Sequence, residues 1–259
     1  MKYITLILFL LLTPALAYTL PNKDFGYKRW RIHVNNMLYR PASTTALLGD
    51  YTINTRFMRG YKIGFEYYFR KGKSLQVITG LDMHFIPLDN YKYELPGKEL
   101  GLEQESYHNY TFRFGRERHN VLSVPVGIFY SKILKNNLNI HFKGGINIDF
   151  IQYGKYTKDY EITNDRNIIK RYLTVNMISQ YNNIAYPSLF LGTGIDYHTL
   201  WAKLHFTLNV QKALIPYMQG SYHFYNLDIS PESNGTYKLW GDFIGLDIGI
   251  TIKKFKKIR

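Results

Sequence analysis

The chain has 259 residues, a formal net charge of +14 at pH 7 and no cysteine. Without cysteine, disulfide frameworks, thiol catalysis and cysteine-ligated zinc are all excluded. Aromatic residues make up 17% of the sequence and glycine supplies 20 residues, and no segment beyond the N-terminus approaches the ~18 consecutive apolar residues of a transmembrane helix. This composition favours strands over helices.

Residues 1–17 have the pattern of an export signal. Lys2 supplies the positive charge, residues 4–12 form an apolar run, and Ala15-Leu16-Ala17 provides small residues at a cleavage position. The apolar run is shorter than the roughly 20 residues that a membrane-spanning helix needs. We therefore predict a cleaved signal peptide over residues 1–17 and a mature chain over residues 18–259.

Eight segments of the mature chain alternate between apolar residues and polar or small ones, which is the pattern of strands with two different faces. The clearest segment runs from Gly60 to Phe69, where Lys62, Gly64 and Glu66 separate large apolar residues. The predicted strands cover residues 30–38, 60–69, 75–85, 122–130, 140–150, 188–197, 203–211 and 240–253.

The connections between these strands alternate between short and long. Tight turns are predicted at residues 70–73, 134–138 and 198–200, and long loops at 40–53, 87–119, 152–184 and 214–238. Short periplasmic turns and long outer loops are typical of outer-membrane barrels. Several strands run ten or more residues, about the length that a tilted strand needs to cross a bilayer. The sequence therefore predicts an all-β, eight-stranded, antiparallel up-and-down barrel in the outer membrane.

The polar face of the predicted strands carries charges of both signs, histidines and glycines. A soluble β-sandwich or lipocalin-like barrel would turn this face to water and its apolar face inward. The glycines favour the opposite orientation, because a narrow barrel interior needs small residues beside large ones, whereas glycine weakens an exposed strand. The predicted interior polar network consists of Lys62, Glu66, Asp82, His84, His141, Lys143, Asp149, Asp196, Lys203, His205 and Asp247.

Aromatic residues gather near both ends of the predicted strands, which indicates two interfacial girdles. The tyrosines in the outer loops have two interpretations. They form a surface that binds protein or glycan, or their placement has no specific role. The girdle on the turn side contains Phe69, Tyr130, Tyr197, Trp201 and Phe255, and that on the loop side Tyr39, Phe85, Tyr153, Tyr186 and Trp240. The loop tyrosines are Tyr91, Tyr93, Tyr107, Tyr110, Tyr156, Tyr160 and Tyr172.

Two strand motifs resemble a known family. Residues 122–130, LSVPVGIFY, are similar to the "apolar-x-Ile/Val-Pro-apolar-Gly" strand of the small outer-membrane barrels common in Bacteroidetes, which include PorT-like proteins. Residues 244–250, IGLDIGI, resemble the closing strand of the same family. The resemblance implies an outer-membrane location and, for some relatives, a role in type IX secretion or gliding.

No catalytic, metal or cofactor site is predicted. The eight histidines lack the spacing of a metal motif, and His141 and His205 are interpreted as satisfied core histidines. Serine catalysis on lipid A would need a Ser–His–acid arrangement at the outer rim, for which the candidates are His84, Glu105, Ser106 and His108. Nothing in their spacing fixes such a geometry.

The expected partners are outer-membrane lipid and lipopolysaccharide, together with envelope or secretion proteins, and no nucleic acid. Arginine forks bind phosphate well, although a solvated loop explains the same basic residues. The candidate lipopolysaccharide contacts are Arg113, Arg116, Arg118, Arg166, Lys170 and Arg171. We expect a non-enzymatic structural or interaction protein, with a secretion or gliding accessory as the specific form. The alternatives are a lipid A-modifying enzyme, a narrow channel and a soluble periplasmic β-protein.

Overall fold

The protein is seen in a computed structural model that describes most of the chain after the predicted signal peptide. The described residues are 27–69, 74–87, 91–102, 109–113, 118–135, 137–151, 154–163, 168–179 and 185–253. The predicted signal peptide over residues 1–17 lies outside them.

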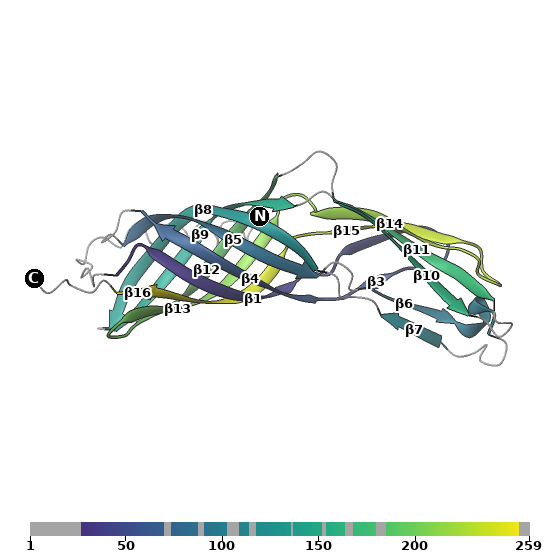
Figure 1. The fold of residues 1–259 in the computed structure, drawn as a ribbon, viewed down its shortest axis with the longest axis horizontal. Coiled ribbons are helices and arrows are strands. Elements are labelled where there is room, and N and C mark those ends of the chain that lie inside the picture. Colours follow the sequence, from purple (N-terminus) through teal and green to yellow (C-terminus); the bar gives the residue numbers. More distant parts are fainter. Residues whose placement is uncertain are drawn as a thin grey trace, which may run out of the picture.

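Eight antiparallel strands of the described chain close into a barrel in the order β1-β16-β13-β12-β9-β8-β5-β4 (Figure 1). Each strand pairs with the barrel strands before and after it in sequence, and β1 pairs with β16 to close the wall. The predicted fold class and its eight strands are confirmed. The strands are β1 Trp30–Tyr39, β4 Met58–Tyr68, β5 Leu75–Pro87, β8 Arg118–Lys135, β9 Leu138–Ile151, β12 Ala185–His198, β13 Ala202–Ala213 and β16 Phe243–Ile252.

The apolar residues of the alternating pattern point away from the barrel axis. Val34 is 50% exposed and lies between Ile63 (48%) and Ile248 (51%) on the neighbouring strands. This orientation contradicts the soluble β-protein, which required the apolar stripes to face inward. Other members of the exterior apolar belt are Ile32, Leu38, Phe65, Leu81, Met83, Leu122, Val126, Ile128, Phe142, Ile146, Leu189, Leu191, Ile195, Phe206, Leu208, Val210, Ile244 and Leu246.

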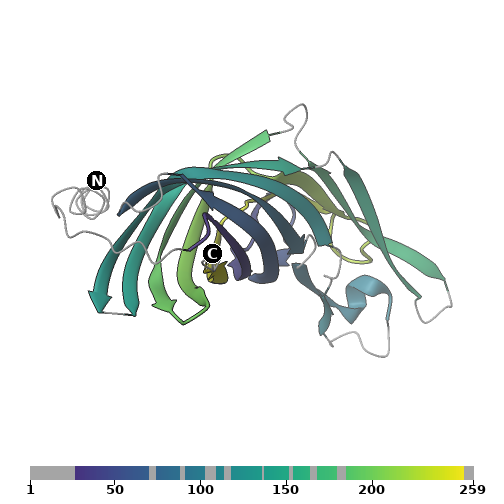
Figure 2. The same cartoon turned by 60° about the vertical axis from the view of Figure 1, so that its left-hand side comes forward.

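The long connections predicted as loops contain further strands, which form an extension beyond one end of the barrel (Figures 1 and 2). A short 3₁₀-helix, η2 Gly97–Leu100, follows one of them, and no helix among the described residues is long and apolar enough to cross a membrane. The extension strands are β2 Ser43–Leu48, β3 Asn54–Thr55, β6 Tyr91–Pro96, β7 Asn109–Arg113, β10 Lys155–Thr163, β11 Ile169–Ser179, β14 Met218–Phe224 and β15 Ser233–Leu239.

The extension continues the barrel wall in the same strand order. Its five-stranded sheet runs β2-β15-β14-β11-β10, which follows barrel strands β1-β16-β13-β12-β9. Its three-stranded sheet runs β3-β6-β7, which follows β4-β5-β8. The wall therefore splits into two layers, seen one above the other on the right of Figure 1.

Tyrosines fill the space between these two sheets. Tyr93 on β6 and Tyr172 on β11 are each 1% exposed, and their hydroxyls lie 2.7 Å apart. The Tyr93 ring stacks on Phe112 with centroids 4.9 Å apart, and it meets Phe224 edge-on at 5.5 Å. Tyr91 and Tyr160 are also buried and hydrogen-bonded to each other. Of the two alternatives for these tyrosines, the binding surface is wrong, because they form a core.

The other aromatic predictions have mixed outcomes. Tyr110 and Tyr156 are only partly buried, against the same core, and Tyr107 lies outside the described residues. The turn-side girdle members Phe69, Tyr197 and Trp201 are exposed as predicted. On the loop side Tyr39 and Tyr186 point inward and are buried, because their strands place them in phase with the polar face. Tyr130, Phe85 and Trp240 are half-buried, whereas Tyr153 and Phe255 are not described.

Gly64 tests how tightly the inner face is packed. A Cβ at this position would lie 1.9 Å from Oδ1 of Asp82 and 2.5 Å from Nε2 of His33. Both atoms are held in ion contacts, so we expect Gly64→Ala to lower the unfolding free energy by about 1–3 kcal/mol. Urea unfolding of the refolded protein measures the change. Gly144→Ala is the control, because its Cβ would meet only the flexible end of Leu191 closely. An equal effect of both substitutions would contradict the tight inner packing.

Candidate functional site

A cluster of alternating charges crosses the middle of the barrel and is called the central cluster here. The Nη2 atom of Arg31 lies 2.9 Å from Oε2 of Glu66 and also 2.9 Å from Oδ2 of Asp247. Nζ of Lys143 reaches the same two carboxylates at 2.8 and 3.2 Å. These contacts arise from the strand register, which sets Arg31 opposite Glu66 on the inner face. Each carboxylate is thereby shared by two cations.

The central cluster extends to one side through His33 and Asp82. Nδ1 of His33 lies 3.2 Å from Asp247, and its Nε2 lies 3.0 Å from Oδ1 of Asp82. The other oxygen of Asp82 contacts Nζ of Lys62 at 2.8 Å. All of these side chains are buried. The mixed signs therefore satisfy the requirement that buried charges be paired.

Asp149 is held differently, by neutral donors near the base of the extension. The hydroxyls of Ser123, Ser188 and Tyr217 donate to its carboxylate at 2.5, 2.8 and 2.5 Å, and Nε2 of Gln211 donates at 3.3 Å. Tyr217 follows β13, so this group links the barrel interior to the first residues of the extension. These hydrogen bonds connect the barrel interior to the start of the extension.

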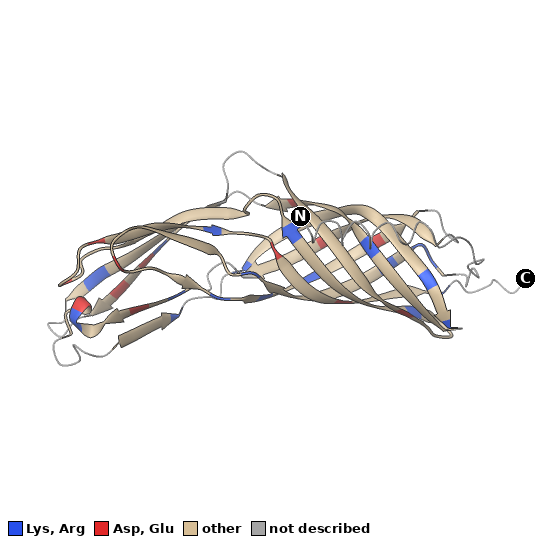
Figure 3. Cartoon of the chain, turned by 180° about the vertical axis from the view of Figure 1, so that it is seen from behind, with Lys and Arg blue, Asp and Glu red and all other residues tan. Residues whose placement is uncertain are grey.

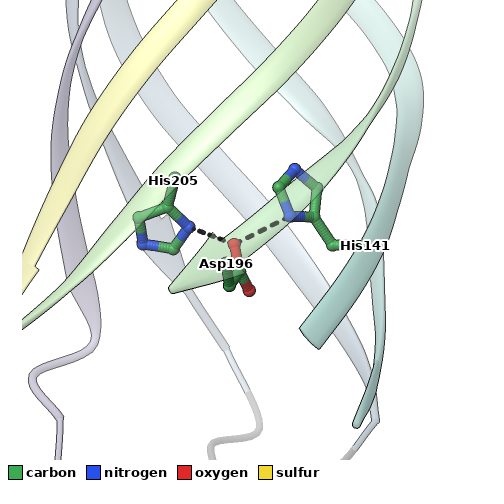
Figure 4. A group of neighbouring side chains, drawn as sticks. All are labelled: His141, Asp196 and His205. Atoms are coloured by element: carbon green, nitrogen blue, oxygen red, sulfur yellow. Dashed lines mark hydrogen bonds and ion pairs between the residues drawn. The ribbon is translucent and has the colours of Figure 1, made fainter. Parts of the chain in front are cut away.

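A third group lies toward the turn end of the barrel and is called the histidine cluster (Figure 4). His141 on β9 and His205 on β13 each place Nδ1 2.7 Å from Oδ1 of Asp196 on β12. Their Nε2 atoms lie 2.9 Å from the hydroxyls of Thr207 and Thr251. The second oxygen of Asp196 contacts Nζ of Lys203 at 3.3 Å.

Little open space remains between these groups. A cavity of about 10 Å³ is lined by Lys62, Glu66, Asp82 and Lys143, among others, which is at the lower limit for one water molecule. His84 is buried on the same inner face, with Nδ1 3.4 Å from the Tyr39 hydroxyl. Figure 3 shows positions of both charge signs along the barrel strands. The buried inward side chains of the described barrel strands thus form a polar core around this cavity.

The structure places every residue of the predicted interior network inside the barrel. The predicted network did not include Arg31 and His33, although Arg31 bridges Glu66 and Asp247. The signal for both was present, because they alternate with Trp30, Ile32 and Val34. Asn35 and Thr207 lie on the same inner face and are buried as well.

The predicted basic contacts do not gather into one phosphate site among the described residues. Lys170 pairs with Asp228, and Arg171 pairs with Asp159 at 3.3 Å and Glu161 at 3.2 Å. Arg118 lies over the Tyr61 ring and donates to its hydroxyl at 3.2 Å. Arg113 is exposed at the end of β7, and Arg116 and Arg166 lie outside the described ranges.

The described part of the structure does not show the residues considered for lipid A chemistry close to one another. His84 is buried beneath the rim, against Tyr39 and Phe243. Glu105, Ser106 and His108 fall in residues 103–108, which the structure does not describe.

Comparison with known proteins gives similarity of overall form only. No protein-family model matches the sequence, and no curated protein sequence matches it either. Among solved structures, OprG from Pseudomonas aeruginosa is 7% identical with a TM-score of 0.38, over 89% of this chain and 98% of that one. A major outer membrane protein from Thermus thermophilus is 14% identical with a TM-score of 0.39, over 87% and 99%. OmpT, an outer membrane protease from Escherichia coli, is 8% identical with a TM-score of 0.34, over 88% and 94%. Scores in this range are too low to assign a shared role.

Proposed function

We propose that this protein is a non-enzymatic outer-membrane barrel whose sealed interior anchors the extension at the cell surface, where it contacts other molecules. The observation that carries the proposal is the exterior apolar belt, which surrounds a polar, charged interior. An apolar surface that encircles a barrel is unstable in water, whereas lipid accommodates it. The strand ends that the short connections join lie at the barrel end opposite the extension, which is where outer-membrane barrels have their periplasmic turns.

The sealed interior favours an anchor over a narrow channel. An eight-stranded barrel is about wide enough for side chains alone to fill. Here the central cluster joins strands that are not neighbours in the wall, since Lys143 on β9 reaches Glu66 on β4 across the interior. A continuous water path past Glu66 and Lys143 would require these ion pairs to separate.

The distal end of the extension supports a role in contact with partners. Three exposed apolar residues lie on different elements of the extension: Leu48 at the end of β2, Ile169 at the start of β11, and Ile229 between β14 and β15. All three side chains are well exposed, as are those of Leu47 and Ile168. Exposed apolar side chains on the outer part of a protein are candidate contacts for partners. The resemblance to PorT-like barrels makes a secretion or gliding apparatus the specific candidate partner, with lipopolysaccharide as the second.

Cysteine labelling tests this topology, since the chain has no cysteine of its own. Ile169→Cys places a thiol on the extension, and Leu200→Cys places one in the turn after β12, where Leu200 is 91% exposed. A maleimide too large to pass the outer membrane is expected to label Ile169→Cys in intact cells. It should label Leu200→Cys only after the membrane is opened. The reverse pattern, or equal labelling of both in intact cells, would contradict the proposal.

A conductance measurement distinguishes a sealed anchor from a narrow channel. The purified full chain in a planar lipid bilayer is expected to give no stable current steps. A reproducible ohmic conductance would show that the central cluster does not seal the barrel.

Glu99 on η2 holds the distal end together, and we expect its effect to depend on pH. Its carboxylate accepts hydrogen bonds from the Tyr51 hydroxyl, the Ser230 hydroxyl and the amide nitrogens of Ile229 and Ser230, at 2.6–3.2 Å. Burial alone would raise the pKa of Glu99, but the hydrogen bonds from Ser230 and its neighbours outweigh burial and set that pKa below its ordinary value.

A carboxyl group whose pKa is lowered by folding stabilises the fold above its unfolded pKa, and this stabilisation is lost as pH falls through the folded pKa. Amide hydrogen exchange at Ile229 and Ser230 should therefore accelerate in acid, beyond the intrinsic effect of pH. Glu99→Gln should exchange faster at neutral pH and lose this acid dependence. An unchanged profile in Glu99→Gln would show that another group controls the distal end.

A further inference from the structure

We propose that the histidine cluster is a binding site for one divalent transition-metal ion, with His141, Asp196 and His205 as its protein ligands. Figure 4 shows both imidazole rings turned toward the Asp196 carboxylate from opposite sides. The potential ligand atoms of the three residues all lie within 4.8 Å of one another. All three side chains are buried on neighbouring strands of the barrel wall, so the backbone fixes their positions before any ion arrives.

The donor set suits zinc and its neighbours among the transition metals. Two imidazole nitrogens and one carboxylate oxygen bind Zn²⁺ at about 2.0–2.2 Å, with a water or another ligand in the open fourth position. At these lengths the ligand atoms of a tetrahedral site are roughly 3.3 Å apart. The Nδ1 atoms now lie 2.7 Å from Oδ1 of Asp196, so a small rotation of the side chains accommodates an ion.

Thr207 and Thr251 supply the hydrogen-bond partners that metal-binding histidines usually have. Such histidines use one ring nitrogen for the metal and donate the other N–H to a fixed acceptor, which orients the ring. Here Nε2 of His141 lies 2.9 Å from the Thr207 hydroxyl, and Nε2 of His205 lies 2.9 Å from that of Thr251. When each Nε2 donates its proton, both Nδ1 atoms are unprotonated and lie 2.7 Å from Oδ1 of Asp196. Unprotonated nitrogens this close to a carboxylate oxygen repel it, and a metal ion bound by all three atoms removes the repulsion.

The ion would enter from the turn end of the barrel. The side chain of Lys203 contacts the second oxygen of Asp196 and remains 16% exposed. Only the Lys203 side chain therefore separates Asp196 from solvent on this side. Because Lys203 is long and reaches the surface, its ammonium group can turn outward when a second cation binds Asp196. No sequence motif points to this site, since its ligands come from three strands and share no characteristic spacing.

Co²⁺ and Zn²⁺ binding to the purified, refolded full chain tests the proposal. We expect one equivalent of Co²⁺ with the visible absorption bands of a tetrahedral complex, and displacement by Zn²⁺. His141→Gln and His205→Gln should each weaken binding about 100-fold or more, and Thr207→Val about 10–100-fold, the range for a residue that orients a ligand. A heat-dependent mobility shift on gels verifies that each variant is folded.

Two control variants make the result specific. His223→Gln removes an exposed histidine of the extension, paired with Glu232 at 2.9 Å, and His33→Gln removes a buried histidine of the central cluster. Neither should change the Co²⁺ spectrum. Absence of binding in the wild type, or binding that survives in folded His141→Gln and His205→Gln, would overturn the proposal. So would binding that His223→Gln abolishes.

Discussion

Replacement of Asp247 by alanine is expected to lower the free energy of unfolding by about 3–5 kcal/mol, the range for breaking a buried ion pair by removal of one partner. The Asp247 carboxylate contacts Arg31, Lys143 and His33 and accepts a hydrogen bond from Asn209 at 3.2 Å. Its loss leaves Arg31 and Lys143 to share Glu66 alone in the closed interior. The small cavity beside them, about 10 Å³, is too small to solvate the excess charge.

Urea titration of the protein refolded in detergent or lipid measures this change. Asp228→Ala is the matched control, because Asp228 also pairs with a lysine, Lys170, but its side chain is 44% exposed. Exposed pairs contribute about 0–1 kcal/mol, so the control should change little. Equal effects of the two substitutions would show that the barrel interior is hydrated rather than packed.

Replacement of Val34 by arginine is the second large expected effect. Val34 lies near the middle of β1, on the outer face, between Ile63 and Ile248. Arginine at the midplane of a lipid-facing barrel surface destabilises by about 2–4 kcal/mol, because its charge must leave water. We expect this loss for the protein refolded in lipid vesicles.

Leu47→Arg provides the comparison on the extension. Leu47 is 67% exposed, more than Val34, but it belongs to β2 outside the barrel. A surface substitution in water changes stability by about 0.5 kcal/mol or less. If Val34→Arg were tolerated as well as Leu47→Arg, the exterior belt would be facing water, and the membrane location would be wrong.

Alternation along the sequence was sufficient to predict the barrel and its two faces. In β16, for example, isoleucine and leucine alternate with Gly245, Asp247 and Gly249 over a length that spans a bilayer. One such strand already indicates which side chains share a face, because successive residues point in opposite directions. The polar interior follows once the apolar face is assigned to lipid.

The extension was missed because its strands are short and lie among polar residues. The segment Tyr91-Lys92-Tyr93-Glu94-Leu95 does alternate, and its buried and half-exposed residues follow that pattern. β10 also alternates, with Tyr156, Tyr160 and Ile162 turned toward the core of the extension. By contrast, β2 is exposed along most of its length, so its sequence carries no strand signal. The order of the strands in the extension follows the order of the barrel strands from which they continue. The sequence of a single segment does not encode that order.

Pairing within the interior also depends on information that spacing alone lacks. His141 and His205 meet at Asp196 only through the registers of β9 with β12 and of β12 with β13. A shift of one residue in either register would turn these side chains to lipid. The members of the polar core were therefore predictable, whereas the partners of each member were not.

Cell fractionation, followed by gel electrophoresis in SDS with and without boiling, distinguishes a membrane barrel from a soluble protein in one experiment. We expect the protein in the outer-membrane fraction, and we expect the unboiled form to migrate differently from the boiled one, because the closed barrel resists the detergent. A soluble periplasmic protein with the same mobility before and after boiling would contradict the membrane barrel.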